Sequence, residues 1–338
     1  MLIDLRSDTL TKPTPQMLEA MMSATVGDDV FGEDPTVNDL ENKAANMLGF
    51  EAGIFCPSGT MANQIAIRVL TNPQDEVICD RRAHIYLYEG GGIASNSMVS
   101  VTLLDGDRGR ISSEQIVASI KPDDIHFPRT RLVALENTVN KGGGCYYTLD
   151  EMAEIHTVCS NHGLSVHLDG ARLFNAVVAS GDDPKQIGKY FDSASVCMSK
   201  GLGAPVGSLL LSSKANIKTA KRVRKVFGGA MRQAGYIAAA GIYALNHHID
   251  RLADDHRRAQ EIAGILMAND QIVKVEPVDT NIIIFTLQQD ASVEKFLLKL
   301  ENSGILALPF GGQSIRMVTH LDIDDAMIEA FEKVFRNI

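Results

Sequence analysis

Short apolar runs alternate with amphipathic segments over residues 53–211 of the chain. The runs have the length and composition of buried strands, whereas the segments between them repeat apolar residues at helical spacing. We predict strands within 53–56, 76–80, 99–104, 131–136, 164–169, 194–198 and 209–211, and helices over 59–70 and 112–120, after Thr148 and near Ala171. This alternation is typical of an α/β fold, in which helices cover both faces of a mainly parallel sheet.

Cap signals predict two helices before this alternation begins. Thr14 followed by Pro15 is a typical helix start, and apolar residues then recur on one face of the segment. Thr36 and Asp39 form a variant capping box for a second helix, which we expect to end at Gly49.

The pattern changes after Leu211, where the chain becomes mainly helical as far as Met267 and then mixes strands with helices. This change predicts a compact α+β unit in the C-terminal part. We therefore expect an N-terminal segment over 1–14 that contributes to the active site, a large domain over 15–247 and a small domain over 248–338.

The composition narrows the range of partners. With 32 basic and 42 acidic side chains, the 338-residue chain has a formal net charge of −10. This balance argues against a nucleic acid or an anionic membrane as the main partner. One segment, 218–229, is rich in lysine and arginine despite this acidic balance. It could bind a phosphate or form a solvated helix face. The longest apolar stretch, 234–245, is too short to span a bilayer.

Two further features concern the cellular compartment. Asp4, Arg6 and Asp8 interrupt the apolar residues that a secretion signal would need at the start of the chain. The five cysteines are scattered without metal-ligand spacing, so they predict neither a disulfide framework nor a zinc site. A cytoplasmic location is expected, and no metal.

Two strand ends carry the side chains of a covalent cofactor site. Lys200 follows the apolar run 194–198, and a partly buried amine at a strand end is suited to attack a carbonyl. Asp169 ends another run, 31 residues earlier, so one intervening helix would place both side chains at the same sheet edge. The pair suits pyridoxal phosphate, with Lys200 on its aldehyde and Asp169 on its ring nitrogen. The alternative for Lys200 is a solvated lysine at the strand end, and the alternative for Asp169 is the N-cap of the helix that follows.

Two more segments point to the same edge. Ser58, Gly59 and Thr60 open a helix directly after a strand, where backbone N–H groups and the helix dipole favour a phosphate. The alternative is an ordinary serine N-cap. His84 follows another strand and could stack on a cofactor ring or take a proton, although a lone histidine is more often a surface residue.

Several separated strings resemble one known family. The strings "DLRSDTLTKPT", "GDDVFGEDPTVNDLE", "SGTMANQ", "LENT", "HLDGAR" and "SKGLGAPVGSLL" occur in the order found in low-specificity L-threonine aldolases. The resemblance covers nearly the whole chain. It implies a fold-type-I pyridoxal-phosphate enzyme, with a mainly parallel seven-stranded sheet and a smaller C-terminal domain. The implied reaction cleaves L-threonine and L-allo-threonine to glycine and an aldehyde.

The resemblance also implies roles for individual residues. The implied cofactor ligands are Lys200 on the aldehyde, Asp169 on the ring nitrogen, Arg172 near the ring hydroxyl, His84 stacked on the ring, and Ser58, Gly59 and Thr60 on the phosphate. Ser7 and Arg316 would bind the α-carboxylate, for which a guanidinium fork is suited. The base at the β-hydroxyl would be His84 or His126, and His84 is favoured. Arg232 would reach the phosphate of a neighbouring subunit in a homodimer or homotetramer.

Two positions depart from the family pattern, and two other readings stay open. Phe31 stands where relatives often have Tyr, and Val139 where they often have His, so stereopreference and aldehyde specificity are open. On the same fold the chain could be a β-eliminating lyase or an aminotransferase. From another class, it could be a catalytically silent ligand-binding homologue, although an intact Lys200, Asp169 and Arg316 argue against that reading.

Overall fold

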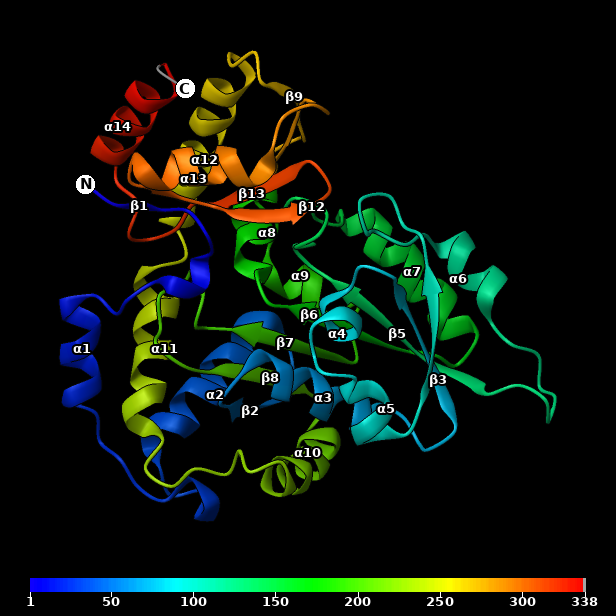
Figure 1. The fold of residues 1–338 in the computed structure, drawn as a ribbon. Helices are drawn as coiled ribbons and strands as arrows, with labels where there is room; N and C mark the ends of the chain where they lie inside the picture. Colours follow the sequence, from blue (N-terminus) through cyan, green and yellow to red (C-terminus); the bar gives the residue numbers. More distant parts are fainter. Residues whose placement is uncertain (337–338) are drawn as a thin grey trace.

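A seven-stranded sheet forms the centre of the computed structural model, which describes residues 1–336. The strand order is β2-β8-β7-β6-β5-β3-β4. The strands are β2 (Ala52–Cys56), β3 (Asp75–Asp80), β4 (Ser100–Leu104), β5 (Arg129–Glu136), β6 (Ser165–Gly170), β7 (Ser193–Cys197) and β8 (Ser208–Ser212). This architecture confirms the predicted α/β fold class (Figure 1).

One strand runs against the others. β8 pairs antiparallel with both β7 and β2, while the remaining strand pairs in the sheet are parallel. A turn over residues 198–207 joins β7 to β8 without a crossover helix, and a strand that returns directly must be antiparallel. This turn carries Lys200 at the end of β7.

Alternating side chains of the strands pack against helices on both faces. Ile54 and Leu210 face α3 (Gly59–Leu70) and α10 (Lys214–Val226), whereas Phe55 and Leu209 belong to a larger core on the opposite face. The helices that contribute to this larger core include α1 (Pro15–Met22), α2 (Pro35–Leu48), α6 (Ser113–Ser119), α7 (Leu149–Asn161), α8 (Leu173–Ser180), α9 (Pro184–Gly188) and α11 (Gly235–His247). Two short helices, α4 (His84–Leu87) and α5 (Gly92–Ser97), follow β3.

The predicted start of α1 is confirmed, and the predicted start of α2 is wrong. The Thr14 side chain accepts a hydrogen bond from the backbone of Met17. For α2 the N-cap is Asp34, whose carboxylate accepts from the N–H groups of Thr36 and Val37. Pro35 then occupies the first helical turn, where its missing N–H costs nothing. The predicted end at Gly49 is confirmed.

The C-terminal part forms a second, smaller unit. A four-stranded antiparallel sheet has the order β12-β13-β10-β9, and it is accompanied by three helices. These elements are β9 (Ile272–Val275), β10 (Ile282–Leu287), β12 (Leu308–Gly311), β13 (Ser314–Val318), α12 (Leu252–Met267), α13 (Val293–Asn302) and α14 (Asp325–Phe335). They bury a hydrophobic core of their own.

The N-terminal segment joins this smaller unit. β1 (Ile3–Asp4) pairs in parallel with β11 (Ile305–Leu306), and Leu5 is buried in the small core. Figure 1 shows the blue β1 beside the orange and red C-terminal elements. Two short 3-10 helices, η1 (Asp8–Leu10) and η2 (Asp29–Phe31), lie in the connections that follow. Within residues 1–336, no helix combines the length and the apolar character that crossing a membrane would require.

Candidate active site

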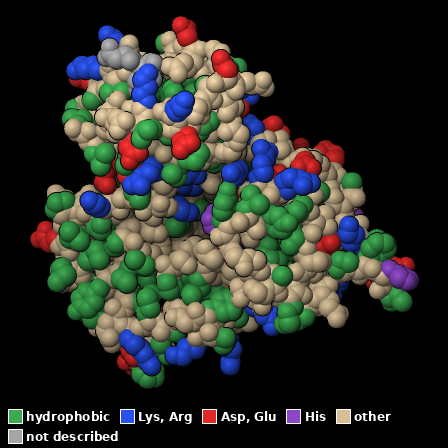
Figure 2. Space-filling model, in the orientation of Figure 1, with side chains coloured by type: hydrophobic (Ala, Val, Ile, Leu, Met, Phe, Trp, Pro, Cys, Tyr) green, Lys and Arg blue, Asp and Glu red, His purple; other side chains and the backbone are tan. Residues whose placement is uncertain are grey.

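Two adjoining cavities lie at the carboxyl ends of the central parallel strands. One has a volume of about 290 Å³ and the other of about 560 Å³, and Thr9, His84 and Lys200 line both. Figure 2 shows a hollow between the upper and lower parts of the molecule, with Lys and Arg side chains along its edges and a His side chain inside it. This is the sheet edge at which α/β folds bind their ligands.

The turn after β7 holds Lys200 in place. The Lys200 carbonyl accepts hydrogen bonds from the backbone N–H of Gly203 (2.8 Å) and from the Thr11 hydroxyl (3.0 Å). A third bond, from the N–H of Ala204 to the carbonyl of Met198, closes the turn. The amine therefore extends into the two cavities from a backbone that is fixed on both sides.

Asp169 lies on the neighbouring strand, at the same edge. β6 pairs in parallel with β7, with Asp169 opposite Ser195, and the Asp169 carboxylate lines the smaller cavity together with Lys200. One carboxylate oxygen accepts from the N–H of Ala171 (3.1 Å), and the other accepts from the Asn63 amide (2.9 Å). The carboxylate does not cap α8, which begins at Leu173 without a side-chain cap.

Asn63 connects the acidic groups beneath this cavity. Its amide nitrogen donates to Asp169 and also to Glu89 (2.9 Å), while its oxygen lies 3.0 Å from Nε2 of His167. Burial lowers the pKa of His167 to about 4, so this imidazole is neutral and donates its Nε2 proton to Asn63. Gln64, the next residue on α3, donates to the second oxygen of Glu89 (2.6 Å). The two buried amide side chains of Asn63 and Gln64 thereby hold both carboxylates in place.

His84 stands at the start of α4 with one ring nitrogen engaged. Its Nδ1 lies 3.0 Å from a Glu89 oxygen, and its backbone N–H donates to Glu136 (2.8 Å). Burial opposes protonation of the imidazole, but the Glu89 hydrogen bond and the charge of Asp169 outweigh it and raise the pKa of His84. Ligand-type atoms of His84, Glu89 and Asp169 lie within 4.8 Å of one another.

The N-terminus of α3 forms part of the wall of the smaller cavity. The Ser58 hydroxyl accepts a hydrogen bond from Met61 and so caps the helix. Ser58, Gly59 and Thr60 all line the cavity. The N–H groups of Gly59 and Thr60 are in the first turn, where a helix has no carbonyl for them, so they can bind an anion.

Arg316 is one of the cationic side chains that line the larger cavity. Nη1 donates to the Asn140 side chain (2.9 Å) and Nη2 to the backbone carbonyl of Arg6 (3.1 Å). Its buried Nε has no hydrogen-bond partner among residues 1–336. Ser7, the other residue expected to bind a carboxylate, lines the same cavity. A fixed guanidinium with a free donor fits a carboxylate ligand.

Arg172 lines the same cavity, but its charge is already balanced. Its Nε and Nη2 donate to the two oxygens of Asp8 at 2.7 and 2.6 Å. Burial opposes ionisation of Asp8, but the adjacent guanidinium outweighs it and lowers the pKa of Asp8 to about 2. Arg172 is therefore held beside the site by an ion pair, consistent with its predicted place near a ring.

Two predicted site residues lie away from both cavities. His126 sits on an exposed loop before β5, where its ring contacts Asp124. His126 is therefore absent from the lining of the two cavities of its own chain, and its role as a base stays a prediction. Arg232 is half-exposed and pairs with Asp28 (2.9 Å), so it does not contribute to the cavities of its own chain.

The two departures from the family pattern also lie outside the cavities. Val139 is buried in the large core, and its backbone pairs with Cys145. Phe31 is 72% exposed on η2, with the Arg232 guanidinium 5.9 Å from its ring centre. Neither side chain contributes to the ligand cavities of its own chain.

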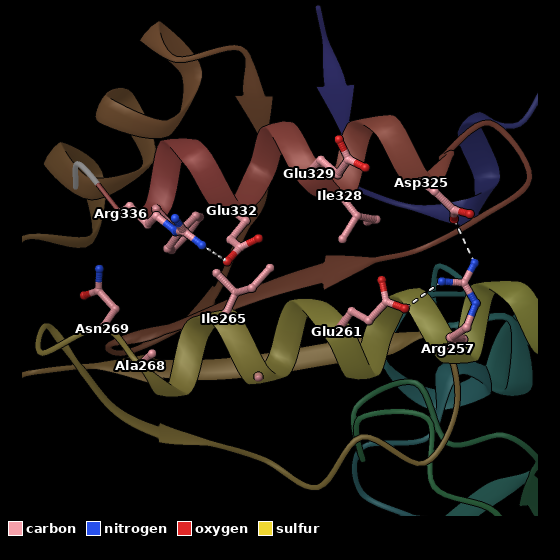
Figure 3. A pocket seen from close by; sticks show the side chains of 12 residues that line it. Arg257, Glu261, Ile265, Ala268, Asn269, Asp325, Ile328, Glu329, Glu332 and Arg336 are labelled. Carbon is pink, nitrogen blue, oxygen red and sulfur yellow. Dashed lines mark hydrogen bonds and ion pairs between the residues drawn. The ribbon is translucent and has the colours of Figure 1, made fainter.

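A further cavity of about 660 Å³ lies far from this edge, between α12 and α14 (Figure 3). Most of its charged side chains are paired with one another, since Arg257 contacts Glu261 and Asp325, and Arg336 contacts Glu332. It holds none of the predicted site residues. The cavities around Lys200 are therefore the candidate active site.

The comparison with protein families agrees with this geometry. Residues 4–290 match the family model described as β-eliminating lyase. The chain belongs to the β-eliminating lyase family. Among the β-eliminating lyases, it is 44% identical over 324 residues to the low-specificity L-threonine aldolase of Escherichia coli K12, covering 95% of each chain. It is 41% identical to the low-specificity L-threonine aldolase 1 of Arabidopsis thaliana, covering 95% of this chain and 92% of the relative.

Solved structures share the fold. The threonine aldolase of Leishmania major superposes with a TM-score of 0.86 at 21% identity, covering 99% of each chain. The serine palmitoyltransferase of Sphingomonas wittichii gives a TM-score of 0.78 at 18% identity, covering 99% of this chain and 86% of that one. At these identities the likeness establishes the fold of this β-eliminating lyase family member.

Sequence reasoning missed most of the residues that hold the site together. Their common feature is a polar side chain that is buried or half-buried and bonded across long sequence distances; they are Asn63, Gln64, Glu136, Asn140 and His167. A signal existed for Asn63 and Gln64, since two polar residues interrupt the apolar face of a helix. Glu136 ends a strand in the string "LENT", which places it at the ligand edge.

Proposed function

We propose that the chain cleaves L-threonine and L-allo-threonine to glycine and acetaldehyde, with pyridoxal phosphate as its cofactor. The observation that carries this proposal is the buried Asp169 carboxylate in a cavity with the Lys200 amine. Within residues 1–336, no Lys or Arg pairs with Asp169, and a buried charge requires a partner. The protonated ring nitrogen of the cofactor supplies that partner. The identity of 44% to the aldolase of Escherichia coli supports the substrate.

The donor set of the smaller cavity fits this cofactor. Lys200 would hold the aldehyde carbon, Asp169 the ring nitrogen and the α3 N-terminus the phosphate, with His84 beside the ring. When bound, pyridoxal phosphate supplies an electron sink for the pair released from the Cα–Cβ bond. The two amide side chains on α3 hold the Asp169 and Glu89 carboxylates in place for this ligand.

The protein side chains around the larger cavity would orient the substrate and move its proton. Arg316 would bind the α-carboxylate through its free Nε, with Ser7 as a second donor. Because Nδ1 of His84 is bonded to Glu89, Nε2 is the nitrogen that would take the proton from the β-hydroxyl. Its raised pKa makes the neutral imidazole of His84 a stronger proton acceptor.

The test is product analysis with purified protein, added pyridoxal phosphate and either L-threonine or L-allo-threonine. Equal amounts of glycine and acetaldehyde are expected, and Lys200→Ala should form neither. Pyruvate with ammonia, or activity only with an added keto acid, would instead identify a β-eliminating lyase or an aminotransferase. A protein that binds the cofactor through Lys200 and forms no product from any of these reactions would be a silent homologue.

We further propose that Arg232 completes the phosphate site of a neighbouring subunit in a homodimer or homotetramer. Support comes from its exposed position beside Phe31 and outside the cavities of its own chain. Arg232→Ala should weaken pyridoxal phosphate binding, measured by equilibrium titration, without changing the assembly in sedimentation. Unchanged cofactor affinity would end this proposal.

The proposed domain organisation keeps a segment over 1–14, a large domain over 15–247 and a small domain over 248–338, whose last two residues lie outside the described structure. The change of hydrophobic core within α12 supports it, since Leu252 packs in the large core and Ala259 in the small one. We also propose a cytoplasmic location, which suits the five cysteines, all of them buried free thiols.

A further inference from the structure

The larger cavity holds a cation that the proposed reaction does not use. Lys141 is half-buried in the turn after β5 and lines this cavity with Arg316. Its Nζ lies 4.0 Å from the ring centre of Phe310 and 5.7 Å from that of Tyr88. Among residues 1–336, no carboxylate pairs with this amine, so its charge is balanced only by aromatic rings.

The larger cavity has one more positive charge than the proposed threonine substrate needs. The Arg172 guanidinium is neutralised by Asp8, and Lys200 is assigned to the cofactor. Arg316 has no acidic partner and is sufficient for the single α-carboxylate of threonine. Lys141 therefore adds a second uncompensated positive charge to a cavity whose proposed substrate has one negative group.

The two charges are placed to act on one ligand. The Arg316 guanidinium lies 5.5 Å from the ring centre of Phe310, so it and the Lys141 amine are separated by no more than the sum of their distances to that ring. They are also linked through the chain, because Asn140, the residue that binds Arg316, directly precedes Lys141. Contact with two aromatic faces holds the amine at the cavity wall instead of in solvent.

We infer that Lys141 is a specificity residue for β-hydroxy-α-amino acids that carry a second carboxylate on the β-carbon, of which 3-hydroxyaspartate is the simplest. This inference rests on the proposed function and extends its substrate class. Arg316 binds the α-carboxylate, and Lys141 binds the distal carboxylate; both cations lie beside the Phe310 ring. An ammonium in this partly desolvated position is a strong partner for a carboxylate.

The reaction balances without any further reactant. The bond between Cα and Cβ of 3-hydroxyaspartate breaks, and its electron pair stays on Cα, which then takes a proton to form glycine. The β-hydroxyl loses its proton to Nε2 of His84, and Cβ becomes the aldehyde carbon of glyoxylate. No group is oxidised by an external agent, as in the cleavage of threonine.

The experiment compares kcat/KM for L-3-hydroxyaspartate with kcat/KM for L-threonine, using purified holoenzyme. Both β-epimers of each substrate are assayed, with glycine and the matching aldehyde measured separately. The ratio of the two kcat/KM values should fall about tenfold in Lys141→Met, since a hydrogen bond to a charged group is lost. Lys141→Arg keeps the charge and should preserve most of the ratio. The absorbance of bound cofactor and the circular dichroism spectrum check that each variant is folded.

The outcomes separate this inference from the proposed function. Cleavage of threonine with no cleavage of 3-hydroxyaspartate overturns the inference and leaves the proposed function standing. Equal losses on both substrates in Lys141→Met also overturn it, because the residue would then act on structure or on the cofactor. Cleavage of 3-hydroxyaspartate alone, with no threonine cleavage, overturns the proposed threonine substrate while the role of Lys141 stands.

Discussion

The ion pair between Asp8 and Arg172 fixes the N-terminal segment to the proposed large domain, and its removal tests how strongly that segment is held. Both carboxylate oxygens accept from the guanidinium, at 2.6 and 2.7 Å, and both side chains are buried. Asn281 of the smaller unit approaches the same carboxylate at 3.5 Å. Asp8→Asn removes the charge and one acceptor while keeping the size of the side chain.

The size of the effect follows from the pKa of Asp8. A fall from 3.8 to about 2 means that, after the cost of burying the carboxylate, Arg172 and the other neighbours stabilise its ionised form by about 2 kcal/mol net. The variant also leaves a buried guanidinium without its counter-charge, a change that typically costs about 3 to 5 kcal/mol. Since asparagine still accepts one hydrogen bond, we expect a loss of about 3 kcal/mol, or about 5 °C in Tm.

The sign of the pH dependence is also determined. Because the pKa of Asp8 is lowered in the folded protein, the contribution of the carboxylate is complete above about pH 4 and declines as the pH falls towards 2. The difference in stability between the wild-type protein and Asp8→Asn should therefore shrink on acidification. An asparagine at this position has no proton to gain in that range.

The measurement is the thermal unfolding midpoint of both proteins at pH 7 and at about pH 3, with saturating pyridoxal phosphate at the higher pH and without it at both. Glu261→Gln is a matched control, since it removes an acidic partner of the exposed Arg257, and exposed pairs contribute little. The reasoning is refuted if Asp8→Asn is no less stable than Glu261→Gln, or if its difference from wild type is unchanged at low pH.

Two other predictions concern residues that position His84. Glu89→Gln should lower the pKa of His84, because the hydrogen bond to Glu89 raises it; the acid limb of the profile of kcat/KM against pH then moves to lower pH. An unmoved limb would exclude His84 as the titrating base. Glu136 accepts from the N–H groups of His84 and Asn140, both at 2.8 Å, and an amide cannot accept both. Glu136→Gln should therefore lower kcat and raise KM for threonine in steady-state assays, whereas an unchanged KM would show that Asn140 does not need this anchor.

The sequence predicted well those features that depend on local pattern and strand order. The alternation over residues 53–211 is sufficient to predict a mainly parallel sheet. Lys200 and Asp169 follow the ends of adjacent parallel strands, so they meet at one edge of that sheet. The direction of β8 could not be predicted, because its apolar run has no signature of orientation and only the short connection from β7 decides it. The start of α2 was predicted at Thr36, but Asp34 followed by Pro35 is the stronger start signal and is the N-cap in the structure.

The contacts that shape the site depend on distant pairings, which local patterns do not encode. Asn63 is 106 positions from Asp169, and Arg316 is 176 positions from Asn140. The choice between His84 and His126 could not be made from spacing either, because both precede or follow strands of the same sheet. The fold separates the two within one chain, because His84 lines the cavities beside Lys200 and His126 lies on an exposed loop.

The N-terminal segment links substrate binding to the relative placement of the two sheets. Residues 3–5 are bonded to the smaller unit through β11 and through the N–H of Val318, which donates to the Leu5 carbonyl at 2.8 Å. Three residues later, Asp8 is bonded to Arg172 beside the large sheet. Between these anchors the Arg6 carbonyl accepts from Arg316. A shift of either anchor would therefore move Arg316, the proposed ligand of the α-carboxylate, so the segment would position the substrate as well as bury Ile3 and Leu5 in the small core.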